Sequence, residues 1–221
     1  MEKEGDLAKE RMLDSVYFNN KIYDQERELR HILKTMSLVD RKYFVLPEDR
    51  DHPYEDIPYL IGFDQTISQP TTVARMLLLS GIAKGMNVLE VGSGSGWNAA
   101  LLACLTYPGK VTSVERIPKL SSFAQNNLNN FKMNTKTSRL NLEFVKGSVF
   151  AHRSLRRNKF DVIIVTAAAD EELKKKMKLF NFDLLIIPTS DGALEIWKKR
   201  AGKAILFMKE QGYAFVPLIE K

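Results

Sequence analysis

The stretch VLEVGSGSGWNAALL, Val88–Leu102, holds an apolar run that ends on an acid, three glycines within five residues, and a run of small and apolar side chains. A short apolar run bounded by glycine is typical of a buried strand, and the residues from Trp97 onward favour a helix. A strand, a tight turn and a helix make up the repeating unit of an open parallel sheet. Ligands bind such sheets at the carboxyl ends of the strands, so this turn is the predicted ligand site.

The same alternation of strands and helices continues along the chain, which predicts an α/β, Rossmann-like fold with a mostly parallel sheet. Strands are expected at 87–91, 111–115, 142–146, 161–166 and 183–188, and helices at 71–79, 97–106, 117–130 and 170–178. The final part reads as short strands with turns at Ala201-Gly202 and Gln211-Gly212. We therefore expect an antiparallel edge at the C-terminal side of the sheet.

The segments before this core have a different character. Residues 1–37 carry apolar positions at helical spacing, which predicts two helices with a break around Phe18–Asn20. The stretch 38–70 contains four of the eight prolines and predicts an irregular, functional loop. We interpret 1–221 as one domain, with a helical cap at 1–37, a substrate loop at 38–70 and a cofactor-binding core with C-terminal strands at 71–221.

Composition restricts the class of protein. Apolar residues make up 44% and charged residues 27%, which is typical of a globular chain, and no apolar run is long enough for a membrane helix. The charged N-terminus and the single cysteine, Cys104, predict a cytoplasmic protein that has no membrane partner. The formal charge is +6, and basic residues gather in runs at 153–159, 174–178 and 198–200. The first two runs lack the interleaved aromatic residues that proteins binding single-stranded nucleic acid add to charge. Nucleic acid is therefore not the expected partner.

The glycine turn has the spacing G-x-G-x-G, at Gly92, Gly94 and Gly96, and not the G-x-G-x-x-G of nicotinamide enzymes. Glu90, two residues before the first glycine, would repel a phosphate but suits a cationic ligand. Glu115 ends the next expected strand, where a carboxylate can accept both ribose hydroxyls. S-adenosylmethionine has a sulfonium, an ammonium and no phosphate, so it is the predicted cofactor.

The substrate is less directly indicated by generic motifs. The segment after the fourth core strand, VTAAAD at 165–170, lacks the [ND]-P-P-[YF] turn of enzymes that methylate exocyclic amines. No Asp, Asn and His cluster has the spacing of metal ligands, so no metal site is expected. The histidines at 31, 52 and 152 are scattered along the chain.

The long loop is more specific. YEDIPYLIGFDQTISQP, at 54–70, closely resembles the signature YxDxPxxIGxxQTISxP of the protein-L-isoaspartate (D-aspartate) O-methyltransferase family. RKYFV at 41–45 resembles the family's R-x-x-F-V segment, and FVPL at 215–218 resembles its C-terminal strand. The similarity runs from about 38 to 218, with gaps near 147–158 and 179–205. It implies methyl transfer from S-adenosylmethionine to isoaspartyl residues of damaged proteins and peptides.

The resemblance also implies roles for single residues. Ser68 matches the position that the family treats as catalytic. Gln65, Thr66 and Ile67 would form the substrate pocket, and Val216 would lie along the substrate backbone. The implied residues of the cofactor site are Glu90, Gly92, Gly94, Gly96, Glu115 and Ser148.

The chemistry agrees with a serine that has no histidine beside it. A carboxylate is ionised at pH 7, so methyl transfer to it needs alignment and no general base. Ser68 could instead be only a helix cap, since a proline two residues later is suited to the first position of a helix. Both roles stay open at this point.

Three departures from the family pattern bear on the substrate. Asp64 stands where glycine is frequent and adds a negative charge near a pocket for a carboxylate. Ser148 stands where the family has an adenine-contacting Asp, and the fifth core strand lacks its preceding K-x-G-G turn. Two alternatives therefore remain, an RNA methyltransferase that uses the basic runs and a cofactor-binding relative without repair activity. We expect a monomer.

Overall fold

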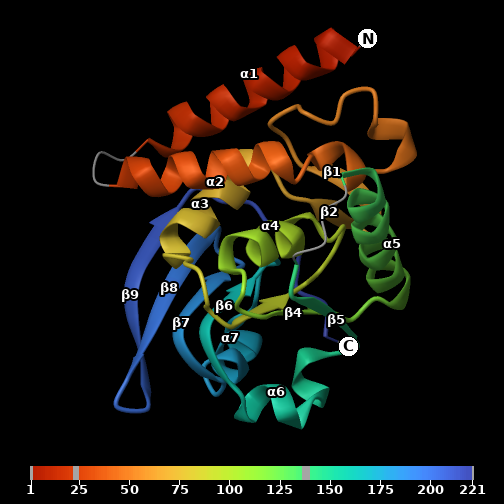
Figure 1. Cartoon of the computed structure of the whole chain (residues 1–221). Helices are drawn as coiled ribbons and strands as arrows, with labels where there is room; N and C mark the ends of the chain where they lie inside the picture. Colours follow the sequence, from red (N-terminus) through yellow and green to blue (C-terminus); the bar gives the residue numbers. More distant parts are fainter. Residues whose placement is uncertain (1, 22–24, 136–139, 221) are drawn as a thin grey trace.

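The computed structural model describes residues 2–21, 25–135 and 140–220. Its centre is a seven-stranded sheet in the order β5-β4-β3-β6-β7-β8-β9 (Figure 1). Pairing is parallel from β5 to β7, and antiparallel for β7 with β8 and β8 with β9. The strands are β3 (Val88–Val91), β4 (Val111–Glu115), β5 (Leu142–Lys146), β6 (Lys159–Val165), β7 (Asn181–Pro188), β8 (Ala193–Arg200) and β9 (Lys203–Gln211). The mostly parallel α/β fold with an antiparallel edge is confirmed.

The sheet separates two apolar clusters, because successive side chains of a strand point to opposite faces. On β3, Val88 belongs to the first cluster and Leu89 to the second. The first is covered by α3 (Pro70–Ser80), α4 (Trp97–Thr106) and α5 (Pro118–Thr135). The second is covered by α6 (Arg153–Arg157) and α7 (Glu171–Met177). β3 and β4 are buried on both faces, as strands between two helical layers must be.

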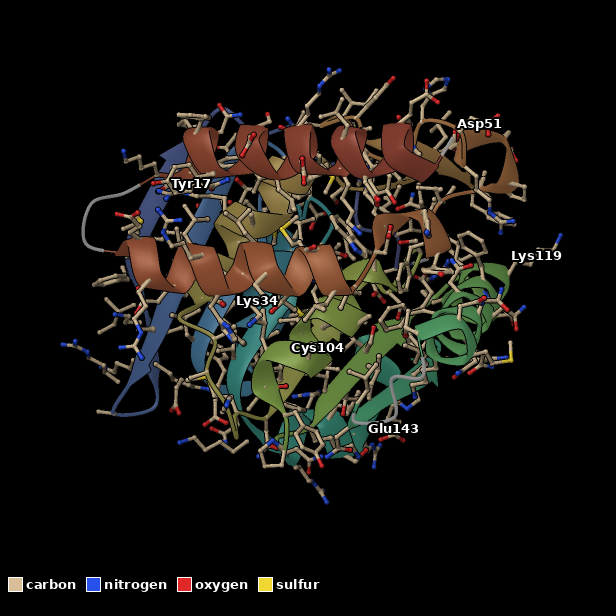
Figure 2. The ribbon with its side chains drawn as sticks, turned by 45° about the horizontal axis from the view of Figure 1, so that its top comes forward. Tyr17, Lys34, Asp51, Cys104, Lys119 and Glu143 are labelled. Atoms are coloured by element: carbon tan, nitrogen blue, oxygen red, sulfur yellow. The ribbon has the colours of Figure 1, made fainter. Side chains whose placement is uncertain are left out.

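The N-terminal helices lie outside the first layer. α1 (Glu2–Asn20) packs on α2 (Glu26–Leu38) and α3, and α2 also contacts α4 (Figure 1). α2 buries Leu29, Ile32 and Met36, which lie on one helical face. α1 runs unbroken through Phe18–Asn20, so the break expected there is wrong; α2 begins at Glu26. Cys104 lies on α4 beneath α2 (Figure 2), and burial raises the pKa of its thiol to about 11.

The segment 38–70 is more ordered than an irregular loop. It has two short 3-10 turns, Arg41–Tyr43 and Pro47–Asp49, and an antiparallel hairpin of β1 (Tyr59–Gly62) and β2 (Gln65–Ile67). Phe63 and Asp64 form the two-residue turn with φ of 57° and 55°, the positive values that a type I′ hairpin turn requires. Asp64 is exposed at the tip, where it tolerates this backbone better than most residues. The charge that the sequence placed near the pocket therefore points to solvent.

The C-terminal segment differs from the expected strand. FVPL forms only an isolated parallel bridge between Pro217 and Ala168. Ala168 N–H donates to the Val216 carbonyl at 2.8 Å, and Leu218 N–H donates to the Ala168 carbonyl at 2.8 Å. These two hydrogen bonds hold the C-terminal segment beside Ala168, which follows the carboxyl end of β6.

Two surface features bear on partners. β9 is the free edge of the sheet, and Ile205 and Phe207 on it are 51% and 56% exposed. Lys174, in the second basic run, is buried and pairs with Glu195 and Glu171, so that run is not wholly a solvated face. Among the described residues, no helix is long and apolar enough to cross a membrane.

Candidate active site

The glycine turn joins β3 to α4 at the carboxyl end of the sheet, beside the point where the strand order reverses between β3 and β6. Gly92 has a φ of 99°, and a Cβ there would lie 2.3 Å from Thr166 Oγ1 at the end of β6. Thr166 donates to the Gly92 carbonyl at 2.7 Å. A side chain at Gly92 would therefore displace the threonine that fixes the turn, so glycine is required there on steric grounds.

Two adjoining cavities meet at this turn and share Thr66, Gly92, Gly94 and Thr166 in their walls. The adenosine-side cavity, as we call it, runs toward Glu115, Gly147 and the C-terminal segment. Its other wall residues include Gln65, Ile117, Leu120, Val149, Val216, Leu218 and Glu220. The serine-side cavity holds Ile67, Ser68, Trp97 and Asn98. The hairpin β1–β2 thus faces the glycine turn across both cavities.

Glu115 lies at the end of β4 with 6% of its surface exposed. One carboxylate oxygen accepts the Gly94 N–H and the other accepts the Ile117 N–H, each at 2.9 Å. A carboxylate oxygen has two acceptor positions, so each can still receive a hydroxyl. The geometry suits the two hydroxyls of a ribose.

Glu90 is fully buried behind the turn and is not among the residues that line either cavity. Asn98 Nδ2 donates to its carboxylate at 2.8 Å, and Ser113 donates to the other oxygen. Burial raises the pKa of Glu90 to about 8, although these two hydrogen bonds oppose the shift. Without a nearby cation the side chain therefore keeps its proton at neutral pH, and it reaches the serine-side cavity only through Asn98.

Ser68 lines the serine-side cavity just before α3, and its hydroxyl makes no hydrogen bond to any residue that the structure describes. The N-cap of α3 is Gln69, without a side-chain cap, and the Thr71 N–H donates to Asp56 Oδ1 at 2.8 Å. Asp56 therefore does the capping that the sequence left open for Ser68. The serine hydroxyl therefore has no capping role among the described residues and lies in the cavity wall.

Arg41, which the sequence indicated only as part of the R-x-x-F-V segment, makes the most hydrogen bonds within the substrate loop. Its guanidinium is fully buried and donates to the carbonyls of Pro53, Glu55 and Ile57 at 2.9, 3.0 and 2.9 Å, and to that of Ser68 at 3.4 Å. It also lies 4.9 Å from the Tyr59 ring and 5.5 Å from the Trp97 ring. Burial lowers its pKa to about 10, so it stays charged at neutral pH.

Two of the expected cofactor residues have other contacts. Gly96 begins α4 with a φ of 86°, and a Cβ there would approach Ala124 of α5 to 3.1 Å, so it permits close packing of the two helices. Ser148 accepts the Phe150 N–H at 3.2 Å and donates to Glu220. Neither residue lines the two cavities. The cavities are also lined by three residues that the sequence did not indicate, Thr166, Asn98 and Glu220. Only their positions after β6, in α4 and near Val216 could have pointed to them.

The fold and the glycine turn facing an acidic strand end define a class, the Rossmann-like S-adenosylmethionine-dependent methyltransferases. A family model for protein-L-isoaspartate(D-aspartate) O-methyltransferase matches residues 16–221, and the chain belongs to this family. A protein-L-isoaspartate O-methyltransferase of Pyrococcus horikoshii is 39% identical over 186 residues, which cover 81% of this chain and 80% of the relative. One of Methanothrix thermoacetophila is 35% identical over 219 residues, covering 97% and 96%.

The fold is also shared with solved structures. A Plasmodium falciparum protein, described as a protein-L-isoaspartate O-methyltransferase in complex with S-adenosyl-L-homocysteine, superposes with a TM-score of 0.79. It is 24% identical, and the match covers 96% of this chain and 99% of that one. This similarity confirms the architecture that the strand order defines.

Proposed function

We propose that the protein transfers a methyl group from S-adenosylmethionine to the carboxylate of L-isoaspartyl residues in damaged proteins. Family membership supports this activity, and the observation that carries it is the placement of the QTIS hairpin opposite the glycine turn. The methyl ester would make methanol the leaving group when the backbone amide nitrogen closes to a succinimide. That ring then opens in part to ordinary aspartate, which is a repair.

The described residues fit the cofactor. Glu115 has free acceptor positions for the ribose, and Gly92 and Gly94 leave room for the amino-acid end against bare backbone. Bound S-adenosylmethionine supplies a methyl group whose C–S bond breaks toward sulfur as the substrate oxygen forms its bond to carbon. Asn98, held by Glu90, presents the remainder of its amide to the serine-side cavity.

Ser68 would orient the substrate. Its hydroxyl is available to donate to one carboxylate oxygen, which leaves the other oxygen to attack the methyl carbon. The substrate is already ionised, so the protein needs to align the oxygen, carbon and sulfur and to exclude water. Thr66 and Ile67 would close the pocket, with Gln65 supporting the loop and Val216 beside the substrate backbone.

We further propose that the protein acts as a cytoplasmic monomer on proteins and peptides and not on nucleic acid. The free, half-buried thiol of Cys104 suits a reducing compartment. Several cations of the basic runs already have anionic partners, as in Lys159 with Asp183 and Lys176 with Glu172. These pairs reduce the free positive charge that phosphate contacts would need.

The test is transfer of radiolabelled methyl from S-adenosylmethionine to a peptide that carries one isoaspartate. The same peptide with ordinary aspartate and total RNA are the controls. We expect base-labile label on the isoaspartyl peptide alone. Label on RNA would favour the RNA methyltransferase, and cofactor binding without label on any of the three would favour the inactive relative.

A further inference from the structure

The far end of the adenosine-side cavity is formed by residues after β5 and by the C-terminal segment, and methyl transfer itself assigns no role to them. Beyond Glu115 its walls are Gly147 and Val149, which follow β5, and Leu218–Glu220 of the C-terminal segment. β5 pairs with β4 on the side away from the glycine turn. A nucleoside whose ribose is held at Glu115 would therefore extend its base toward Gly147 and the C-terminal segment.

The side chains at this end match a flat heterocycle. Ile117, Leu120, Val149 and Leu218 supply apolar surface. Arg116 and Glu220 are charged residues of the same cavity, and Glu220 is the hydrogen-bond acceptor of the two. Apolar walls with one precisely placed polar group are typical of small-ligand sites, in which the polar group sets the specificity. The atoms of Glu220 therefore decide which base fits.

Glu220 is oriented by a specific contact. The Ser148 hydroxyl accepts the Phe150 N–H at 3.2 Å and donates its single proton to Glu220 Oε2. Oε1 has no hydrogen-bond partner within the described part of the chain. Burial raises the pKa of this carboxyl above its ordinary value, while the Ser148 hydrogen bond and the nearby Arg116 and Lys176 oppose that shift.

We propose that Glu220, positioned by Ser148, accepts a hydrogen bond from the exocyclic amine of the cofactor's adenine and so selects adenine over its 6-oxo counterpart. This inference rests on the proposed function, because it takes S-adenosylmethionine as the ligand. A carboxylate accepts from an amine but repels a carbonyl oxygen at the same place. A site built to pair with an N–H discriminates strongly against the analogue that lacks it.

The sequence explains why two residues share this task. Ser148 lies directly after the strand end, but a hydroxyl is a weaker acceptor for an amine than a carboxylate is. Here the hydroxyl donates its proton to the carboxylate of Glu220, which lies more than 70 positions later in the chain. The acceptor for the base thus comes from the C-terminal segment, and Ser148 holds it in place.

The test compares the binding of S-adenosylhomocysteine and S-inosylhomocysteine by titration calorimetry. These ligands differ at position 6 of the purine, which carries an amine in one and an oxygen in the other, and in the N1 proton that accompanies the 6-oxo form. For the unaltered protein we expect the adenosyl ligand to bind about tenfold or more tightly than the inosyl ligand. In Glu220→Gln the amide can rotate to donate to the oxygen, so the preference should fall to about threefold or less.

Ser148→Ala should reduce the preference in part, because Glu220 then lacks its fixed orientation. Glu143→Gln is the matched control, since Glu143 is an exposed acid at the outer edge of β5 (Figure 2) and should leave the preference unchanged. Equal thermal unfolding midpoints for the three variants would show that folding is intact.

Each outcome bears on one proposal or on both. If the unaltered protein binds both ligands equally, or Glu220→Gln keeps the full preference, Glu220 does not recognise the base and the methyl-transfer proposal is unaffected. If the unaltered protein binds neither ligand while it is folded, the cofactor assignment and this inference both fail. A collapse of the preference in Glu220→Gln with the control unchanged supports the inference.

Discussion

At the scale of single residues, the free hydroxyl of Ser68 makes the most direct prediction. Ser68→Ala should lower kcat for an isoaspartyl peptide by about tenfold or more, because one hydrogen bond that aligns the attacking carboxylate is lost. The dissociation constant for S-adenosylhomocysteine should stay near its normal value. Steady-state kinetics together with calorimetry measure both quantities.

Glu115→Ala is the contrasting variant for the same assays, and it should weaken cofactor binding first. Since α3 is capped by Asp56, loss of the Ser68 hydroxyl should also leave thermal stability unchanged. An unaltered kcat in Ser68→Ala would remove the serine from the mechanism. A fall in the unfolding midpoint would instead point to a structural role.

Glu90 predicts a pH dependence of stability. Its pKa is about 8 in the folded chain against an ordinary value of 4.5, so the unfolded chain releases the proton more readily. The contribution of Glu90 is therefore fully present below about pH 4.5 and is lost as pH rises to about 8. Between these limits the loss is about 1.4 kcal/mol for each pH unit.

Urea unfolding of the unaltered protein and Glu90→Gln between pH 5 and 8 tests this. The difference between their free energies of unfolding should shift steadily in favour of the variant as pH rises. Glu143→Gln, at an exposed position, is the control and should follow the unaltered protein. Parallel curves for the unaltered protein and Glu90→Gln would mean that Glu90 is ionised in the folded chain.

At the scale of elements, the substrate loop depends on one side chain. Arg41 reaches four carbonyls at different points of 53–68, and a lysine ammonium cannot span them from one point. Arg41→Lys should lower the free energy of unfolding by about 3 kcal/mol, because buried carbonyls lose their donors. It should also raise KM for the peptide, since β2 and Ser68 lose their support.

The matched control is Arg30→Lys on α2. Arg30 is 65% exposed and pairs with Glu26 at the surface, so its replacement should cost less than about 0.5 kcal/mol. Urea unfolding and peptide kinetics are the measurements. Similar losses for both variants would contradict the special role of Arg41.

The elements also show where sequence reasoning succeeds and fails. The core strands and most helices between them were predicted because apolar runs and glycine turns are local signals, but the five-residue helix α6 was not. The hairpin β1–β2 was not, because its strands are three and four residues long and its turn, Phe63–Asp64, has no glycine. FVPL was expected to form a strand, but it makes a single bridge, with Ala168. The local sequence cannot show which backbone segment lies beside it.

The site was predictable to the extent that it lies on motifs. The sequence indicated Gly92, Gly94, Glu115 and the QTIS segment, and all of them line the cavities. The sequence could not show that Glu90 lies outside the cavity walls, because its burial depends on how α4 packs against β3. It also could not place Glu220, whose contact with Ser148 is set by the path of the C-terminal segment.

At the scale of the whole molecule, the open edge of the sheet bears on association. β9 exposes Ile205 and Phe207, and an unpaired apolar edge strand can template pairing with another chain. Lys203, on the same strand, is exposed and opposes such pairing by its charge, whereas Lys209 is paired with Asp191 and Glu195. We therefore expect the charge of Lys203 to help keep the protein monomeric.

Lys203→Leu should shift the protein toward larger species, measured by light scattering after gel filtration, because it extends the apolar edge. Lys175→Leu, on the exposed face of α7, adds the same side chain away from any strand edge and should leave the mass unchanged. Association in both variants would indicate general stickiness, and association in neither would mean that the edge is protected in another way.

The last wall of the cavity has a consequence for synthesis. The adenosine-side cavity joins residues near 65, 92 and 115 to Val216, Leu218 and Glu220. Translation delivers these parts in order, and N-terminal structure forms while later residues are still being added. A nascent chain can complete its parallel strands and its glycine turn while 216–220 are still inside the ribosome, but its nucleoside pocket then lacks a wall. Cofactor binding therefore has to wait until residues 216–220 have left the ribosome, after the parallel strands and the glycine turn.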